Sequence, residues 1–190
     1  MGANILTRYI ETVGKNCPFK SAVCMSVPFN VDIVTKKLMP LQKTLYDKHL
    51  NLNSKEIVQK NYQILKQHEA EIGYDLDGAL TSKNVREFDK YMTAPINGFD
   101  NLKDFYHDIS SGHYIKDISI PVLFIHSLDD PVCVKECIPI DDIEKNENCI
   151  LILTQKGGHI EWFTGSNPKR WAYKPTLEFL TYHAEKNGDF

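Results

Sequence analysis

Two adjacent acids and one histidine follow short apolar runs in the second half of the chain, and together they could carry out acid–base chemistry. Asp129 and Asp130 come after the apolar run 120–125, and His159 comes after the run 149–154. Such runs, rich in β-branched residues, are typical of buried parallel strands. Because ligands bind beyond the carboxyl ends of parallel strands, an acid and a histidine placed there can meet over one site. A carboxylate that orients an imidazole is the acid–base half of a nucleophile–His–Asp triad.

The two adjacent acids compete for the role of orienting the histidine. The residues Asp129-Asp130-Pro131-Val132 fit the D-x-x-V pattern of hydrolase acid loops from Asp129, with the valine returning to the core. Asp129 is therefore predicted to hold His159, whereas Asp130 is expected to cap a short helix over residues 135–144. The glycines at 157 and 158 allow the tight turn that would place an imidazole over the strand ends.

The first residues of the chain bear on the third member of the triad, the nucleophile. In α/β-hydrolases the nucleophilic serine lies in a G-x-S-x-G turn between a strand and a helix. The opening Met1-Gly2-Ala3-Asn4 matches the last two positions of that turn and the start of the helix behind it. The serine would then fall one residue before Met1, and we expect the sequence to begin part-way through a serine hydrolase. The backbone N–H of Met1 would be half of the oxyanion hole, and losing one such donor costs about 3–4 kcal/mol of transition-state stabilisation.

Composition limits the class of protein and the kind of partner. The chain has 190 residues, of which 42% are hydrophobic and 25% charged, and its net charge is −3. These values predict a globular domain that is short for a complete α/β-hydrolase. No basic block stands out, so neither a nucleic-acid partner nor an anionic membrane is expected. The cysteines are odd in number and irregularly spaced, which favours a reduced, intracellular compartment. Any membrane anchor would lie in an N-terminal segment outside this chain.

The predicted core consists of strands alternating with helices. Residues 1–13 have the spacing of an amphipathic helix, with Ile5, Leu6, Tyr9, Ile10 and Val13 on its apolar side. A strand is predicted over 19–27, and a final helix is predicted to open at Asn167-Pro168. The fold class is therefore α/β, the C-terminal portion of an α/β-hydrolase fold: residues 1–28 would supply the first helix and a core strand, and residues 118–190 the part carrying the acid and the histidine.

The segment 29–117 contains helical patterns and no convincing strand. A capping-box spacing at Asn53-Ser54-Lys55-Glu56 predicts a helix start, and an apolar stripe of Val58, Tyr62, Leu65 and Ile72 runs up to Gly73. Further helices are predicted over 84–91 and after Asp100, whose side chain would cap the second of them. An insertion of this length is too long for a connector between two strands, so it is predicted to be a helical cap that shapes the pocket.

A metal site is considered and disfavoured. His126, at the end of a predicted strand, lies near Cys133 and Cys137 in the sequence, but the Cys-x3-Cys pair falls on a predicted helix and has no second pair. No metal and no other cofactor is therefore expected. The remaining histidines have no partner pattern and are expected at the surface; they are His49, His68, His107, His113 and His183.

Taken together, these motifs resemble the YheT-like branch of α/β-hydrolases, also called the AB hydrolase 4 family, which includes esterases, phospholipases and ethanol acyltransferases. The resemblance covers nearly the whole chain and rests on the following residues: Met1-Gly2-Ala3-Asn4, Val85-Arg86-Glu87-Phe88-Asp89, Thr93, Gly98-Phe99, Asp104-Phe105-Tyr106, Ser110, Ile120-Pro121, Asp129-Asp130-Pro131, Ile138-Pro139 and Gly157-Gly158-His159-Ile160.

By that resemblance, Asp129 and His159 would be the acid and the histidine, and an upstream serine would transfer medium-length acyl groups from esters, acylglycerols or phospholipids. One departure is visible, because relatives usually carry Gly-Phe where this chain has Glu161-Trp162. An anionic Glu161 near the imidazole would raise its pKa or alter the mouth of the pocket. Some relatives have an N-terminal membrane anchor, so the resemblance implies a cytoplasmic or membrane-associated protein.

Function is predicted as serine ester hydrolysis or acyl transfer by the complete protein, with the 190 residues alone inert. A rival hypothesis is a non-catalytic acyl-binding or regulatory module that has lost the nucleophile. A third is a dehalogenase-like or hydroxynitrile-type use of the same fold, since fold alone does not fix the reaction.

Overall fold

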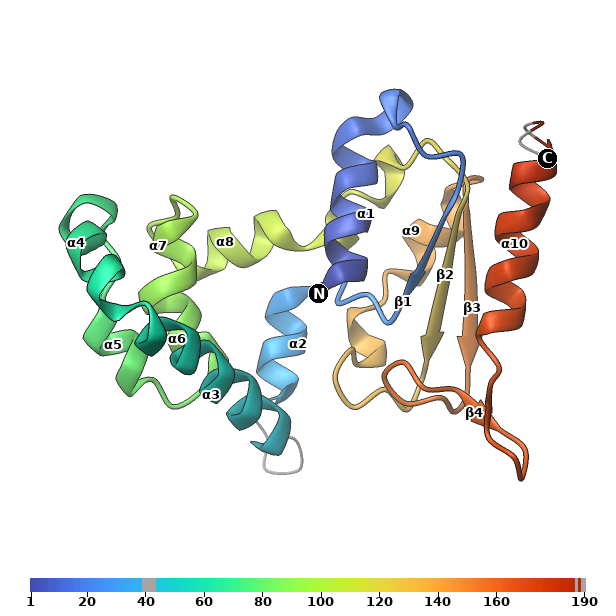
Figure 1. Cartoon of the computed structure of the whole chain (residues 1–190). Helices are drawn as coiled ribbons and strands as arrows, with labels where there is room; N and C mark the ends of the chain where they lie inside the picture. The colour runs from blue at the N-terminus through green and yellow to red at the C-terminus, as the bar shows by residue number, and fades with distance from the viewer. Residues whose placement is uncertain (39–43, 187, 189–190) are drawn as a thin grey trace. The chain divides into compact units, whose positions relative to one another are not determined.

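The computed structural model describes residues 1–38, 44–186 and 188, and the chain divides into two compact units. Unit 1 consists of Met1–Asn30 and Ser110–Phe190, and unit 2 is Val31–Ile109. Both are shown in Figure 1. Unit 1 contains the sheet and unit 2 contains helices only among its described residues. The predicted boundaries of the insertion were 29 and 117, and its role as a cap stays a prediction.

A three-stranded parallel sheet forms the centre of unit 1. Its order is β1 (Ala22–Met25), β2 (Val122–Ser127) and β3 (Cys149–Thr154). Every residue of β2 is buried, which explains why its first part, Val122–Ile125, is a continuous apolar run rather than an alternating one. Because all three strands run in the same direction, their carboxyl ends lie at one edge, where Met25 pairs with Ile125 and Ser127 with Thr154. The predicted α/β fold class is confirmed.

Helices cover both faces of this sheet (Figure 1). Helix α1 (Gly2–Val13) and helix α9 (Ile140–Lys145) lie on one face, and α10 (Tyr173–Lys186) lies on the other. The α10 side is an apolar cluster, which consists of Leu123, Ile125, Trp162 and Ala172 with Val23, Met25, Ile152 and Phe179 packed against it. Burial of this surface, at about 25 cal/mol per Å² of apolar area, holds the helix on the sheet.

Helix α1 forms where it was predicted, but it buries a different face. Its buried residues are Asn4, Thr7, Ile10 and Glu11, whereas Ile5 is 65% exposed. Two of the buried polar side chains make hydrogen bonds, since Ser111 donates from Oγ to Asn4 Oδ1 at 2.8 Å and Thr7 Oγ1 donates to the carbonyl of Ala3 one turn earlier. Glu11 Oε1, in contrast, has no hydrogen-bond partner among the described residues. The amphipathic pattern therefore located the helix correctly but not its contact face.

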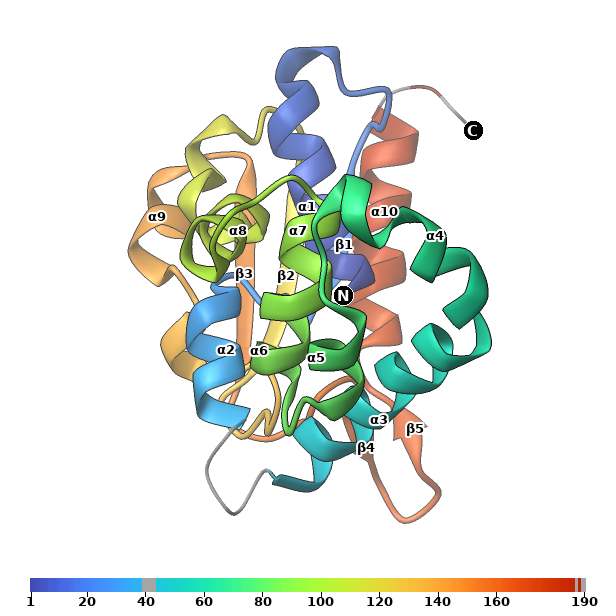
Figure 2. The same ribbon diagram turned by 90° about the vertical axis from the view of Figure 1, so that its left-hand side faces the viewer.

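Unit 2 consists of helices among its described residues, seen most clearly in Figure 2. Its elements are α2 (Val31–Leu38), α3 (Thr44–Lys60), α4 (Tyr62–Ile72), α5 (Leu76–Thr81), α6 (Val85–Phe88), a π-helical turn (Asp89–Thr93), α7 (Ala94–Ile96) and α8 (Leu102–Ile109). One core cluster contains Val58, Tyr74, Leu76, Ala79, Phe88 and Met92, and a second contains Val31, Ala94, Phe105 and Tyr106.

Helix starts in unit 2 differ in part from the predicted ones. The capping-box residue Ser54 lies inside α3, where its Oγ donates to the carbonyl of Leu50 one turn earlier, so no helix starts there. Helix α8 is capped by Asn101, whose Oδ1 accepts from the N–H of Asp104, and not by Asp100 as predicted. In contrast, Gly73 does end α4, with a left-handed φ of 88°.

The segment after His159 forms a hairpin before the last helix begins. Strands β4 (Phe163–Thr164) and β5 (Lys169–Arg170) pair antiparallel, so Asn167-Pro168 lies in their connection and does not open a helix. The helix predicted over 135–144 is likewise shorter, because Pro139 separates a 3-10 turn, Lys135–Cys137, from α9.

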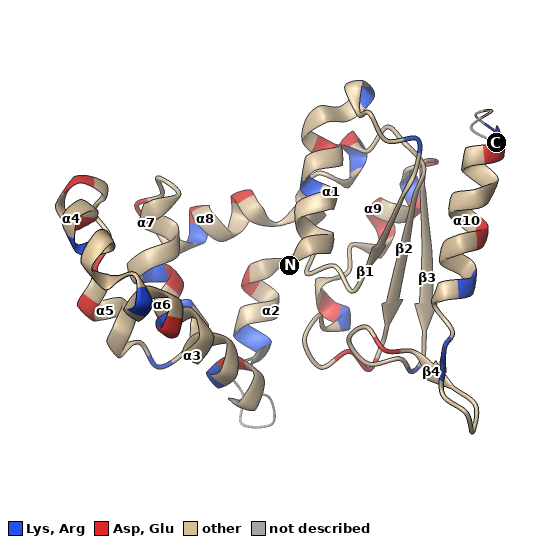
Figure 3. Cartoon of the chain, viewed as in Figure 1, with Lys and Arg blue, Asp and Glu red and all other residues tan. Residues whose placement is uncertain are grey.

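Charged residues of both signs are interspersed on the helices of both units (Figure 3). Helix α9, for example, has Asp141 and Asp142 in its first turn and Lys145 in its last, an arrangement of charges that interacts favourably with the helix dipole. Among the described residues, every helix is too short or too polar to cross a lipid bilayer.

Candidate active site

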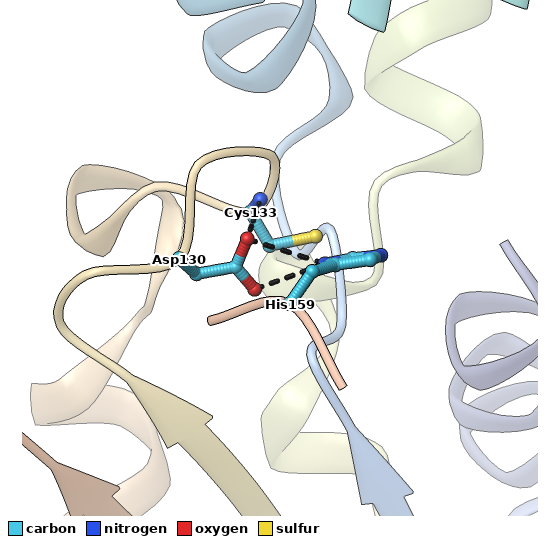
Figure 4. A group of neighbouring side chains, drawn as sticks. All are labelled: Asp130, Cys133 and His159. Atoms are coloured by element: carbon cyan, nitrogen blue, oxygen red, sulfur yellow. Dashed lines mark hydrogen bonds and ion pairs between the residues drawn. The ribbon is translucent and has the colours of Figure 1, made fainter. Parts of the chain in front are cut away.

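His159 and Asp130 meet at the carboxyl edge of the sheet. His159 follows β3 and Asp130 follows β2, and Nδ1 of the imidazole lies 3.0 Å from Oδ2 and 3.2 Å from Oδ1 of the carboxylate (Figure 4). The expected meeting of an acid and a histidine from neighbouring strands is therefore present. The acid that makes this contact is Asp130.

Asp129, the predicted partner of His159, holds the backbone of the histidine loop instead. Its Oδ1 accepts hydrogen bonds from the N–H groups of Gly157 at 2.9 Å and Gly158 at 3.0 Å, and its side chain is exposed. The hydrogen bond from Gly158, supported by that from Gly157, keeps the pKa of Asp129 below its ordinary value. The prediction that Asp129 pairs with the imidazole was wrong.

Asp130 is held in place by the backbone that follows it. Its Oδ1 accepts from the N–H groups of Val132 and Cys133, each at 2.8 Å, so the carboxylate holds the bend that follows it. It does not cap a helix as predicted, because the 3-10 turn and α9 begin after Val134 and Pro139 without a side-chain cap. The side chain is completely buried, while that of His159 is 35% exposed. An imidazole can act as an oriented general base when one ring nitrogen bonds a buried acceptor and the other faces solvent.

The orientation of the imidazole determines what it can do. With Nδ1–H donated to Asp130, the lone pair is on Nε2, and Figure 4 shows that end of the ring pointing away from the carboxylate. In this tautomer Nε2 can accept a proton from a hydroxyl group, and the charge that forms on the ring is stabilised by Asp130.

Two serines at strand ends anchor the histidine loop, and sequence reasoning missed both. Ser26, after β1, donates from Oγ to the carbonyl of His159 at 2.7 Å, and Ser127, at the end of β2, donates to the carbonyl of Gly158 at 2.7 Å. Ser26 also has a left-handed φ of 48°, a strained conformation for a residue other than glycine. The sequence feature that could have indicated this anchoring is a serine at the carboxyl end of each of two adjacent strands.

The turn before His159 requires glycine for two separate reasons. Gly158 has a left-handed φ of 63°, and a Cβ on Gly157 would overlap the indole ring of Trp162. Trp162 is itself fixed, because its Nε1–H donates to Thr154 Oγ1 at 2.9 Å and its side chain is buried in the α10 cluster. The Trp162 indole therefore packs against the turn at Gly157. The adjacent Glu161 is exposed.

The three residues weighed as metal ligands from the sequence, His126, Cys133 and Cys137, do not form a ligand group among the described residues. His126 is fully buried and stacks on Phe29, with ring centroids 5.5 Å apart, and neither of its ring nitrogens has a hydrogen-bond partner there. Burial lowers the pKa of His126 to about 4. Cys133 instead lies beside Asp130 and His159, and Cys137 is outside that group.

The amino terminus lies near enough to Cys133 for its charge to act on the thiol. Burial raises the pKa of the Cys133 thiol and the charge of Asp130 adds to the rise, while the positive charge of the Met1 amino group acts in the opposite direction. The carbonyl of Met1 accepts from the N–H groups of Asn4 and Ile5, as expected at the start of α1. The role of Met1 in an oxyanion hole stays a prediction.

A hollow in unit 1 lies at the other end of the sheet. It has a volume of about 870 Å³ and is lined by residues that precede β2 and β3, among them Ser119 and Asn148, together with Lys15 and Lys145. The amino ends of parallel strands do not converge on His159, so this hollow is separate from the candidate active site.

Comparison with known proteins supports the same family. No family model matches the chain. The chain is 33% identical over 192 residues to embryogenesis-associated protein EMB8 of Picea glauca. The matched region covers 98% of this chain and 41% of that protein. It is 33% identical over 175 residues to phospholipase ABHD3 of Bos taurus, covering 91% of this chain and 41% of that protein. It is 26% identical over 188 residues to the putative esterase YheT of Escherichia coli, covering 97% of this chain and 54% of that protein.

The chain thus spans about two fifths to half of the length of the curated relatives it matches. Over that span it has the parallel sheet of an α/β fold, with an acid after β2 and a histidine after β3. Its similarity to proteins named as a phospholipase and an esterase confirms the resemblance found in the sequence. The chain belongs to the α/β-hydrolase family.

Proposed function

We propose that this chain provides the acid–base half of an ester-hydrolysing site, with His159 as general base and Asp130 as the acid that orients it. The observation that carries this proposal is the contact between His159 Nδ1 and the buried Asp130 carboxylate at the carboxyl edge of the sheet. The family of the chain and the names of its relatives support ester hydrolysis as the class of reaction.

In the proposed mechanism a serine hydroxyl attacks the ester carbonyl as its proton passes to Nε2 of His159. Asp130 keeps the proton on Nδ1 and stabilises the imidazolium that forms. His159 then gives the proton to the leaving alcohol, and an acyl-enzyme remains. Water or a second alcohol, activated by the same imidazole, releases the acyl group, so the site hydrolyses esters or transfers acyl groups.

The serine is proposed to come from a segment that precedes Met1. The match of Met1-Gly2-Ala3-Asn4 to the end of a nucleophile elbow favours this. In the extended protein the N–H of Met1 would be a peptide N–H able to bind an oxyanion.

Carboxylic esters of medium-length acyl chains, acylglycerols or phospholipids are the proposed substrates. Support comes from the relatives, one of which is named a phospholipase and another a putative esterase. Residues 29–117 are proposed to act as a helical cap that selects the acyl chain.

The test compares the 190-residue chain with a version extended by the coding sequence immediately upstream. Both are treated with a fluorescent phosphonate probe that labels activated serines, and both are assayed on p-nitrophenyl butyrate and p-nitrophenyl octanoate. We expect labelling and hydrolysis in the extended protein alone, and we expect both to be abolished by His159→Gln.

Two results would contradict the proposal. Labelling of the 190-residue chain by itself would show that the nucleophile is within it. An extended protein that binds the octanoate ester without hydrolysing it or taking up the probe would favour the non-catalytic acyl-binding module instead.

A further inference from the structure

Three side chains with different ligand chemistry converge at the candidate active site. A carboxylate oxygen of Asp130, the Sγ of Cys133 and a ring nitrogen of His159 all lie within 4.8 Å of one another (Figure 4). Around a tetrahedral zinc ion, ligand atoms of these types are about 3.4–3.6 Å apart, as follows from zinc bond lengths of about 2.0–2.3 Å. The three atoms are therefore close to the spacing of a zinc site.

We propose that Asp130, Cys133 and His159 form a zinc-binding site in which the bound ion switches off the acid–base pair. This inference goes beyond the proposed function, because metal binding can be measured without any hydrolase activity. Nitrogen, oxygen and sulfur donors in one site suit zinc, whereas magnesium and calcium prefer oxygen alone.

The surroundings of the three side chains favour binding over simple packing. Asp130 Oδ1 is held by two backbone N–H groups, which fixes the carboxylate and leaves Oδ2 directed at the imidazole. Cys133 lies in the bend that follows Asp130, and its Sγ donates to the carbonyl of Ser26 at 3.1 Å. The backbone contacts to Asp130 are of the kind that orient metal ligands and tune their affinity.

Access and coordination number fit a site with three protein ligands. Asp130 and Cys133 are buried, and the partly exposed imidazole gives an entry path from solvent. A water molecule would complete four-coordination on that side, as in zinc sites with an open position.

Proton balance shows why bound zinc would prevent acid–base catalysis. The Cys133 thiol loses its proton to solvent on binding, and the hydrogen bond to Ser26 is lost with it. The proton on His159 Nδ1 moves to Nε2 so that Nδ1 can coordinate the ion. One proton is released in total, and Nε2, now carrying a hydrogen, can no longer accept one from a serine.

Cobalt(II) replaces zinc in such sites and reports the ligands through its absorption. The reduced 190-residue chain is titrated with Co²⁺ in the presence of a phosphine reductant, which does not compete as a thiol would. We expect a near-ultraviolet thiolate-to-cobalt band, visible bands of four-coordinate cobalt, and loss of both when Zn²⁺ is added.

Matched variants identify the ligands. Cys133→Ser should lose the thiolate band, whereas Cys137→Ser, at an equally buried position outside the group, should keep it. His159→Gln should weaken Co²⁺ binding by at least about tenfold, because loss of even an outer-shell partner of a ligand typically lowers metal affinity by about that factor. Circular dichroism of each variant checks that it has folded.

Each other outcome overturns the proposal. The absence of a thiolate band in the unmodified chain would do so, as would a band that persists in Cys133→Ser. If Cys133→Ser does not fold, unchanged Co²⁺ affinity in His159→Gln decides against the site. A zinc site that is present in a protein without esterase activity would contradict the proposed function alone.

Discussion

Asp130 places both carboxylate oxygens within 3.2 Å of His159 Nδ1, while Asp129, one residue earlier, accepts from the two glycines that precede the histidine. Adjacent acids thus perform different tasks at one strand end. One orients the imidazole, and the other fixes the loop that carries it. The division follows from burial, since Asp130 is enclosed by the turn after it and Asp129 faces solvent.

The first prediction separates these two tasks. In the extended protein, Asp130→Asn should lower the turnover number by about 10⁴-fold, because an asparagine does not hold the active tautomer or stabilise the imidazolium. Asp129→Asn should lower it by less than about tenfold, since the amide oxygen still accepts from Gly157 and Gly158. Steady-state hydrolysis of p-nitrophenyl octanoate measures both. A larger loss in Asp129→Asn than in Asp130→Asn would return the catalytic role to Asp129.

Sequence patterns located the strands well because the signal for a buried parallel strand is local. The run Val122–Ile125 is apolar throughout, and β2 is buried at every position. The choice between Asp129 and Asp130 was not local, because it depends on which side chain the turn directs inward. The pattern D-x-x-V does not encode that direction.

The contact face of α1 was missed for a related reason. Periodicity finds apolar stripes, but α1 buries the polar Asn4, whose partner cannot be deduced from the helix itself. Asn4 bonds Ser111, which lies 107 residues away in the sequence. Long-range polar contacts of this kind become visible only once the fold brings the segments together.

The second prediction concerns the glycine turn. Gly157→Ala should destabilise the chain by about 1–3 kcal/mol, the typical result of overpacking, because the added methyl group meets the Trp162 indole. Gly158→Ala meets no atom and should lose only about 1–2 kcal/mol for its left-handed backbone. Urea unfolding followed by Trp fluorescence measures both.

The packing explanation for Gly157 has its own control. In a Trp162→Phe background the smaller ring leaves more room, so the additional loss caused by Gly157→Ala should shrink. An unchanged loss in that background would show that the indole is not what excludes a side chain at position 157.

The third prediction uses the buried carboxyl group on α1. Burial raises the pKa of Glu11 from 4.5 to about 8, even though Arg8 Nη1, 3.1 Å from Oε2, acts in the opposite direction. The folded state thus binds this proton more tightly than the unfolded state does. The stabilisation it provides is complete below pH 4.5 and is lost as the pH rises through about 8.

Glu11→Gln should therefore flatten the decline of the unfolding free energy between pH 5 and pH 8, by up to about 1.4 kcal/mol per pH unit. Urea titrations at several pH values across that window measure the slope. Glu56→Gln is the matched control, because Glu56 is exposed on α3 and its ion pair with Lys60 lowers its pKa below this window. An identical pH slope in Glu11→Gln and the parent chain would contradict the assignment.

The fourth prediction tests a partly buried hydrogen bond in unit 2. Tyr106 Oη donates to Asp89 Oδ2 at 2.7 Å, and Thr93 Oγ1 donates to the other carboxylate oxygen at 2.6 Å. Burial raises the pKa of Asp89, so its ionised form depends on these donors. Tyr106→Phe removes one donor and should destabilise the full chain by about 1–3 kcal/mol at pH 7. Tyr46→Phe, at an exposed position, should change the unfolding free energy by less than about 0.5 kcal/mol.

The pH dependence of that variant distinguishes a lost hydrogen bond from a lost packing contact. Without the tyrosine hydroxyl the pKa of Asp89 rises further, so its folded-state preference for the protonated form increases. The destabilisation should therefore be smaller at pH 4, where the carboxyl group is neutral more of the time, than at pH 7. A cavity or a packing defect would weaken the protein equally at both pH values. Denaturant unfolding of Tyr106→Phe and the parent chain at pH 4 and pH 7 decides between them, and equal losses would assign Tyr106 to packing alone.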